Sequence, residues 1–365
     1  MSAPGFNGKG NPGSVSGRAA PAGGDGAGPG GPKAGPGRRR KGGRGGERKM
    51  VPDATFTSYD GRPVVKASPW TADIPAYLFL GGLAGGSSLL AAGADRTGRP
   101  ALRRTGRIGA LVAITGSFAA LVHDLGRPER FANMLRVAKP TSPMSMGTWF
   151  LTAYGPAAGL AGAGELSGLA PARWLDTPAV RSLRALARPA GIAAALVAPA
   201  VASYTAVLLS DTATPTWHAG RGEMPFVFVG SAAAAAGGLG MLGAPLDQAG
   251  PARRMALAGA VADLVAETRM EDSMGLAAET LHQGRAGHLI RASKALTGLG
   301  AAATALFGAR SRAVSAVAGA ALLAGSACAR FGIFEAGQSS ARDPKYTVVP
   351  QRRRLEQAGR PAPNG

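Results

Sequence analysis

Long apolar runs, separated by short polar stretches, fill the sequence after residue 70. About 20 mostly apolar residues suffice for a helix to cross a bilayer, and only a helix satisfies the backbone amides of such a run inside lipid. The pattern therefore predicts an all-α fold, a polytopic membrane bundle of about eight transmembrane helices. We expect these spans at Ile74–Ala94, Ile108–Val122, Gly147–Gly164, Pro189–Ser210, Pro225–Leu246, Met255–Ala266, Ala295–Ala309 and Ala313–Ala329.

The first 50 residues differ from the rest of the chain, because they are rich in Gly, Pro and Arg. Phe6 and Val15 are their only large hydrophobic residues before Met50. Such a segment buries too little apolar surface to offset its chain entropy, so we expect residues 1–50 to be a disordered tail. The tail is either a solvated spacer or a segment that binds anionic lipid headgroups. We assign residues 51–335 to the transmembrane domain and 336–365 to a C-terminal extramembrane tail.

The formal net charge of +20 does not indicate nucleic acid binding. Much of it lies in the tail, and the remainder lies between apolar runs, as in the loops of membrane proteins. We therefore expect no nucleic acid partner, lipid around the chain, and a multi-pass position in the cell membrane. Eight spans place both termini on one side. The loop charges mildly favour the termini outside and the basic tail favours the reverse, so the orientation stays open.

Small residues recur at a spacing of four within the apolar runs. In membrane helices this spacing lets two backbones approach closely, although an Ala- and Gly-rich composition alone produces it too. The pairs are Gly81 and Gly85, Gly82 and Gly86, and Gly155 and Gly159.

Two carboxylates, Asp263 and Glu267, interrupt the sixth expected span. Their spacing of four places them on one face of the helix. Ionisable groups within a span are costly and are often functional, and a carboxylate away from water favours its protonated form. We expect the pair to serve as a proton relay, or else to face an arginine or a hydrated groove. Glu165, at the end of the third span, is expected at the membrane interface.

The densest polar cluster follows the second span and contains His123, Asp124 and Arg127. Asp124 could orient the imidazole of His123 or pair with Arg127. Such an arrangement could hydrogen-bond a quinone carbonyl and deliver a proton to it. The simpler alternative is a helix-terminal cap with a solvated salt bridge.

The chain offers few ligands for a redox centre of its own. Cys328 is its one cysteine, whereas an iron–sulfur cluster needs about four ligands. Of the four histidines only His123 touches an expected span, and His218, His282 and His288 fall in expected loops. We therefore expect neither haem nor an iron–sulfur cluster in this chain, and no metal site.

Three stretches resemble the NrfD/PsrC family, the membrane subunits of polysulfide reductase and related enzymes. They are IPAYLFLGGLAGGSSLLAAGAD (residues 74–95), HDLGRPERFANMLRVAKPTSPMSMGTW (123–149) and FEAGQSSARDPKYTVVPQR (334–353). The resemblance covers roughly residues 51–355, and the second stretch is its most specific part.

The resemblance implies an eight-helix membrane anchor that binds quinone or quinol, with menaquinone the expected substrate. It also implies a ferredoxin-like iron–sulfur partner subunit, which connects the anchor to a molybdopterin catalytic subunit. The chain alone is then expected to catalyse nothing. Asp263 and Glu267 remain proton-relay candidates from their chemistry, and not from a motif.

The same resemblance indicates candidate residues for the quinone pocket or its proton route. Tyr77, in the first-span motif, is a possible hydroxyl donor to quinone or an interfacial aromatic anchor. The candidates that match the second stretch are His123, Asp124, Arg127, Thr148 and Trp149.

Two other functions fit the residues alone. A transporter or ion-translocating bundle without quinone chemistry would also use membrane carboxylates, although the sequence shows no convincing repeated halves. A passive anchor without a ligand is the other alternative.

Overall fold

A computed structural model describes residues 63–126, 129, 133–169, 171 and 177–359. Within these ranges the chain forms helices and no strand, which confirms the all-α prediction. Eight of the described helices have 20 residues or more: α1 (Asp73–Arg96), α2 (Pro100–Asp124), α4 (Pro143–Ser167), α6 (Pro178–Ser210), α8 (Met224–Gly243), α9 (Gly250–Ser273), α11 (Gly284–Phe307) and α12 (Arg312–Arg342).

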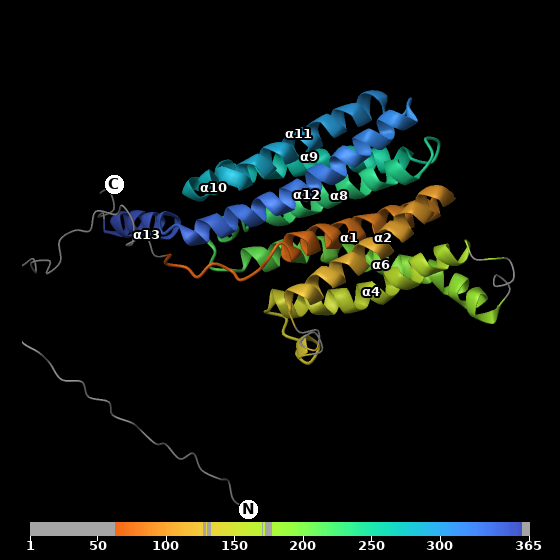
Figure 1. Cartoon of the computed structure of the whole chain (residues 1–365), viewed down its shortest axis with the longest axis horizontal. Helices are drawn as coiled ribbons and strands as arrows, with labels where there is room; N and C mark the ends of the chain where they lie inside the picture. The colour runs from red at the N-terminus through yellow and green to blue at the C-terminus, as the bar shows by residue number, and fades with distance from the viewer. Residues whose placement is uncertain (1–62, 127–128, 130–132, 170, 172–176, 360–365) are drawn as a thin grey trace, which may run out of the picture. The chain divides into compact units, whose positions relative to one another are not determined.

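Successive long helices run in opposite directions through one elongated bundle (Figure 1). The closest neighbours are α1 with α2, α4 with α6, α8 with α9, and α11 with α12, while α1 also packs against α6 and α8. The start of α1 and the end of α12 lie side by side. Gln338 Nε2, near the end of α12, donates to the carbonyls of Ser68 and Trp70, just before α1, at 3.0 and 3.3 Å. We call this end of the bundle the terminal end and the opposite end the distal end.

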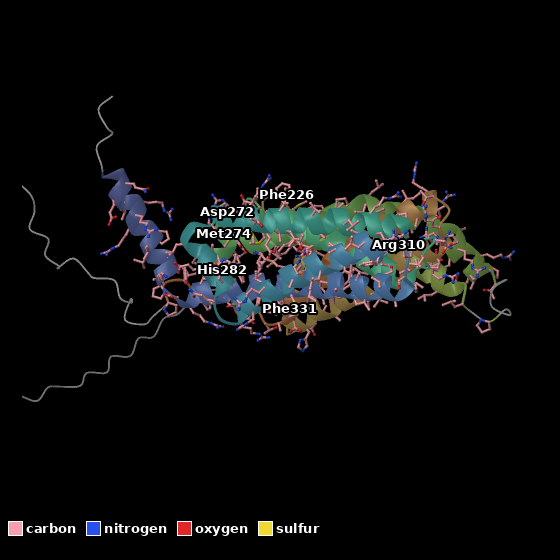
Figure 2. The ribbon with its side chains drawn as sticks, turned by 90° about the horizontal axis from the view of Figure 1, so that it is seen from above. Phe226, Asp272, Met274, His282, Arg310 and Phe331 are labelled. Atoms are coloured by element: carbon pink, nitrogen blue, oxygen red, sulfur yellow. The ribbon has the colours of Figure 1, made fainter. Side chains whose placement is uncertain are left out.

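Short helices cover the terminal end. These are α7 (Pro215–Ala219), the 3₁₀ helix η1 (Gly275–Ala278), α10 (Glu279–His282) and α13 (Lys345–Ala358). Figure 2 shows Met274 and His282 near this end and Arg310 near the other. The Lys345 ammonium donates to Glu279 Oε2 at 2.6 Å, and this bond raises the pKa of Lys345. The bond therefore ties α13 to α10.

Each expected span lies almost wholly inside one long helix, and most of these helices continue well beyond it. The last span was expected to end at Ala329, whereas α12 continues to Arg342. Helix α9 likewise extends from Gly250 to Ser273 around a short apolar run. Hydropathy marks only the apolar part of a helix, whereas backbone hydrogen bonds carry the helix on through its polar turns.

By length and apolar composition, five of the described helices qualify as membrane spans: α1, α2, α6, α8 and α12. The chain is a multi-pass membrane protein.

Glycines permit the close packing of α1 in the bundle. A Cβ added at Gly85 would lie 2.9 Å from the Ala198 carbonyl oxygen, and one at Gly86 would lie 2.8 Å from the Ala232 carbonyl oxygen. The small-residue pattern of α1 therefore corresponds to real backbone contacts with α6 and α8. A Cβ added at Gly159 would have no neighbour within 4 Å, so the small-residue pattern in α4 does not correspond to a backbone contact at this position.

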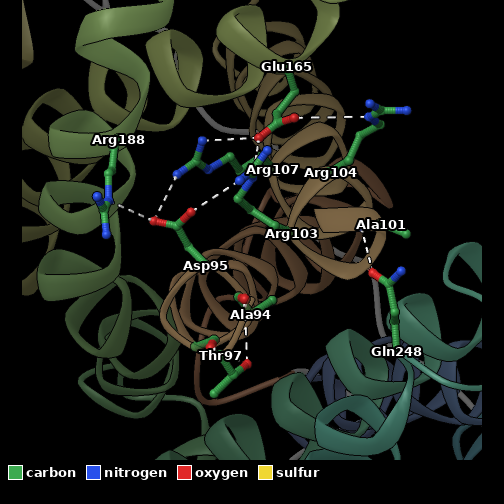
Figure 3. Close-up of polar contacts among 11 residues, drawn as sticks. Ala94, Asp95, Thr97, Ala101, Arg103, Arg104, Arg107, Glu165, Arg188 and Gln248 are labelled. Carbon is green, nitrogen blue, oxygen red and sulfur yellow. Dashed lines mark hydrogen bonds and ion pairs between the residues drawn. The ribbon is translucent and has the colours of Figure 1, made fainter. Parts of the chain in front are cut away.

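An ion-pair network joins α1, α2, α4 and α6 at the distal end (Figure 3). Glu165 Oε1 accepts from Arg103 Nε at 2.7 Å and from Arg107 Nη1 at 3.0 Å. Asp95 accepts from Arg103 Nη1 at 3.2 Å and from Arg188 Nε at 3.1 Å. Both carboxylates lie near helix C-termini, where the helix dipole disfavours negative charge, so they depend on these arginines. Glu165 lies at a helix end as expected, but it is buried.

The variant Glu165→Gln should unfold more easily, because Arg107 is buried and would lose the nearer of its two charged partners, keeping only Asp95 at 3.9 Å. Removing one member of a buried ion pair costs about 3 kcal/mol. Thermal unfolding of the purified chain in detergent measures the loss, with Glu356→Gln, an exposed acid of α13, as the control. Equal midpoints for the two variants would contradict a structural role for the network.

Candidate functional site

The first polar group of the terminal end joins the start of α1 to the end of α2. His123 Nδ1 lies 2.9 Å from Asp73 Oδ2, and the Thr71 hydroxyl donates to the same carboxylate at 2.8 Å. Asp124 instead accepts from the Thr71 backbone amide at 3.4 Å. The carboxylate that contacts the imidazole is therefore Asp73, and not Asp124, for which the sequence left open a pairing with His123 or with Arg127. Arg127, the third expected member, lies outside the described residues.

Asp73 was missed because it precedes the apolar run by one residue. An acid in the first turn of a helix has an ordinary explanation, since it complements the helix dipole. Its pairing with His123 crosses 50 positions of sequence, and no local pattern indicates such a contact.

A buried pair of tyrosines lies one turn further into the bundle. The hydroxyl of Tyr77 on α1 contacts the hydroxyl of Tyr204 on α6, and both rings are buried. The Tyr204 ring packs beside Gly147 at the start of α4, and Phe150 lies 6.1 Å from it between ring centroids. Tyr77 therefore lies inside the bundle and makes a phenol–phenol contact, which an interfacial anchor would not.

Tyr204 was also missed, although the sequence holds a signal for it. It is the one tyrosine in the apolar run that became α6, and a buried phenol usually finds a hydrogen-bond partner. The partner could not be read from the sequence, because it lies 127 positions away.

The other residues expected at the start of α4 differ in exposure. Thr148 is buried and donates to the Met144 carbonyl at 3.0 Å, whereas Trp149 is 40% exposed. Thr148 borders a cavity of about 210 Å³ at the start of this helix, whose lining also includes Met134 and Val137. The cavity, Thr148 and the tyrosine pair thus meet around the first turns of α4.

The second polar group lies between α8, α9 and α12. Asp263 and Glu267 are both buried, so they share an inward face of α9 as their spacing predicts. Arg330 of α12 is buried as well, donates to the Phe228 carbonyl at 2.7 Å, and lies 3.8 Å above the centre of the Phe228 ring. Opposite charges are thus gathered in the interior of a membrane bundle.

This group is only partly satisfied by hydrogen bonds. Among the described side chains, Asp263 Oδ1 and Glu267 Oε1 make no hydrogen bond, and the same holds for Nε and Nη1 of Arg330. A buried polar atom without a partner is costly and calls for a functional explanation. A carboxyl oxygen without a fixed donor is free to take up and release a proton.

Arg330 was missed as a named partner, although an arginine was one of the alternatives expected for the carboxylates. It follows directly after the run that was expected to end at Ala329. Because α12 continues to Arg342, Arg330 lies inside the helix and not at its end.

The remaining histidines occupy helices, so their expected position in loops was wrong. His218 lies in α7, His282 in α10 and His288 near the start of α11. These helical turns are polar and therefore lie outside the apolar runs from which the spans were inferred.

The fold and these groups define a multi-pass helical membrane protein with titratable side chains held inside its bundle. A family model described as polysulphide reductase, NrfD, matches residues 64–246. Since the match covers half of the chain, this chain belongs to the NrfD family, whose members are membrane-anchor subunits of oxidoreductase complexes. No curated protein matches the chain.

The matched residues include the His123 and Tyr77 groups but end before α9. The Asp263, Glu267 and Arg330 group therefore rests on its geometry alone.

The variant Gly147→Ala should disturb the tyrosine pair, because the added methyl group would overlap the Tyr204 ring. Overpacking of this kind costs about 1–3 kcal/mol. Gly159→Ala is a matched control on the same helix, because a Cβ there meets nothing within 4 Å. Thermal unfolding in detergent should show a lower midpoint for Gly147→Ala alone, and equal midpoints would mean that the Tyr204 ring is not held there.

Proposed function

We propose that this chain is the quinone- and quinol-reactive membrane subunit of an oxidoreductase complex. It passes electrons between the quinone pool, in the first place menaquinone, and an iron–sulfur partner subunit that connects to a molybdopterin catalytic subunit. One observation carries the proposal: within the residues matched to the NrfD family, hydrogen-bonding side chains and a cavity of about 210 Å³ meet at the terminal end of the bundle.

The residues at this end fit the chemistry of a quinone. A quinone headgroup has an apolar ring and carbonyl oxygens that accept hydrogen bonds and take up protons on reduction. The side chain of His123 is 80% exposed, and its Nδ1 is engaged by Asp73, so its Nε2 faces outward. Met134 and Val137 supply apolar lining to the cavity at the start of α4, which Thr148 also borders. Asp73 orients the imidazole that would bind and protonate the substrate.

The electrons need a partner protein. An iron–sulfur cluster takes about four ligands, usually thiolates, and Cys328 is the one cysteine of this sequence. A second chain that carries the clusters would complete the path, in keeping with the family's place in oxidoreductase complexes.

The protons need a route through the bundle, and the Asp263–Glu267 pair is our candidate. Two carboxyl groups one helical turn apart lie within reach of one another for proton exchange through a bridging group. The positive charge of Arg330 offsets the negative charge of these carboxylates, but Arg330 donates no hydrogen bond to Asp263 Oδ1 or Glu267 Oε1. Such carboxylates inside a membrane are a recurrent feature of proton relays.

Ion translocation without quinone chemistry is the second candidate function. The observation in its favour is that the α9 carboxylates lie outside the residues matched to the family. A proton flux in liposomes that contain this chain alone, without quinone and without a redox partner, would favour this alternative.

Removing the imidazole should weaken quinone binding. We expect His123→Ala to raise the dissociation constant of a menaquinone analogue about tenfold or more, the equivalent of one charge-assisted hydrogen bond. Asp73→Asn should weaken binding less, because the imidazole remains but is no longer oriented. Equilibrium binding to the purified chain in detergent measures both, and His288→Ala, an exposed histidine of α11, is the control. If His123→Ala and Asp73→Asn both bind the analogue as tightly as the unmodified chain does, this site is refuted.

Removing the α9 carboxylates should affect proton delivery and leave quinone binding intact. We expect Asp263→Asn and Glu267→Gln to slow quinone-coupled turnover of the purified complex about a hundredfold, the usual contribution of a positioned acid or base. Asp272→Asn replaces an exposed acid on the same helix and should turn over normally. If Asp263→Asn and Glu267→Gln turn over at the rate of the unmodified complex, a relay through α9 is excluded.

A further inference from the structure

An arginine-lined pocket opens at the distal end, away from the proposed quinone site. Its volume is about 320 Å³, roughly ten times the ~30 Å³ that one water molecule occupies in the liquid. It is formed where α1, α2, α4 and α6 end or begin, at the level of the ion-pair network (Figure 3). The arginines that line it are Arg103, Arg104, Arg107, Arg184 and Arg188.

The pocket carries an excess of positive charge. Asp95 and Glu165 are its two acids, so five arginines less two carboxylates leave a formal charge of +3. Both acids are already shared between arginines, as described above. The Arg104 Nε atom lies 4.0 Å from the nearest carboxylate oxygen. Arg184 donates to the hydroxyl and carbonyl oxygens of Ser167, at 3.2 and 3.3 Å, and therefore bonds no acid in this network.

Arg107 is the most deeply buried of these arginines. Its side chain is 8% exposed, and its Nε makes no hydrogen bond within the described part of the chain. A Cβ at position 191 would lie 3.1 Å from Arg107 Nη2 and 3.2 Å from Nε, so Gly191 leaves room for the buried guanidinium. A guanidinium that is buried at a cost and only partly paired keeps positive charge at the wall of the pocket.

We propose that this pocket binds a phosphate group. Several guanidinium groups converging on one small cavity match the geometry of phosphate oxygens, which accept paired hydrogen bonds from arginine. The pocket lies where α1 ends and where α2 and α6 begin, three of the helices that qualify as membrane spans, and lipid headgroups are found at the ends of such spans. The phosphate is therefore supplied either by an anionic phospholipid headgroup or by free phosphate in the adjoining water. Binding there links the ends of α1, α2, α4 and α6.

The test uses the full chain purified in an uncharged detergent and compares two phosphate sources. Native mass spectrometry counts bound phosphatidylglycerol, with diacylglycerol as the phosphate-free counterpart, and calorimetry measures binding of inorganic phosphate. In the double variant Arg104→Gln with Arg184→Gln we expect binding of phosphate or lipid to fall about tenfold or more. This variant removes the 4.0 Å contact between Arg104 and Glu165 but spares Arg103, Arg107 and Arg188, whose shorter ion pairs to Asp95 and Glu165 stay in place.

The matched control is Arg254→Gln with Arg310→Gln, which removes two exposed arginines from the same end of the bundle. It lowers the net charge equally, so it should bind as the unmodified chain does. Selective binding of phosphatidylglycerol identifies a headgroup site, and binding of inorganic phosphate identifies a site for the soluble anion. The proposal is overturned if neither source binds, if diacylglycerol binds as well as phosphatidylglycerol, or if both double variants lose binding equally.

Discussion

Lipid offers no hydrogen bonds to the backbone and little solvation to charge, and the rest of this structure depends on that constraint. It forces the apolar runs into helices. It also makes every ionisable group inside the bundle expensive unless another group compensates it. The ionisable groups of this chain are compensated in two ways. Asp95 and Glu165 are neutralised by arginines at the distal end, where they join four helices. Asp263, Glu267 and Arg330 are gathered in the interior and keep atoms that find no hydrogen-bond partner among the described residues. The first arrangement is structural in character, and the second is suited to chemistry.

The two ends of the bundle carry different chemistry for the same reason. At the terminal end a carboxylate, Asp73, engages His123. An imidazole held in this way can exchange protons with a substrate. At the distal end arginines outnumber acids, and guanidinium groups do not release protons under ordinary conditions. That end is therefore suited to holding charge in place, and the terminal end is suited to moving it.

The sequence predicted the helices well, because hydropathy reflects the dominant energetic term in lipid. It also identified Asp263 and Glu267 as sharing one face, since a spacing of four is a local property of a helix. It could not identify the partners Asp73, Tyr204 and Arg330, because each of them lies 50 or more positions along the chain from the residue it faces. It offered Asp124 as a partner of either His123 or Arg127, whereas in the structure Asp73 contacts the imidazole. Adjacent residues in a helix point in different directions, so sequence neighbours are poor guides to such pairs.

Helix α1 is the element that contacts both candidate regions. It contributes Asp73 and Tyr77 near the terminal end, within the residues matched to the NrfD family. One further turn along, a Cβ at Gly82 would lie 3.8 Å from Arg330 Nη2, the guanidinium that faces the α9 carboxylates. Tyr77 and Gly82 are separated by about 7.5 Å along the helix axis at 1.5 Å per residue. Tyr77 and the point where Arg330 meets α1 are thus offset by little more than one turn of a single helix. Because a glycine at position 82 lets Arg330 lie against α1, the same small-residue packing that holds the bundle together also sets this short separation.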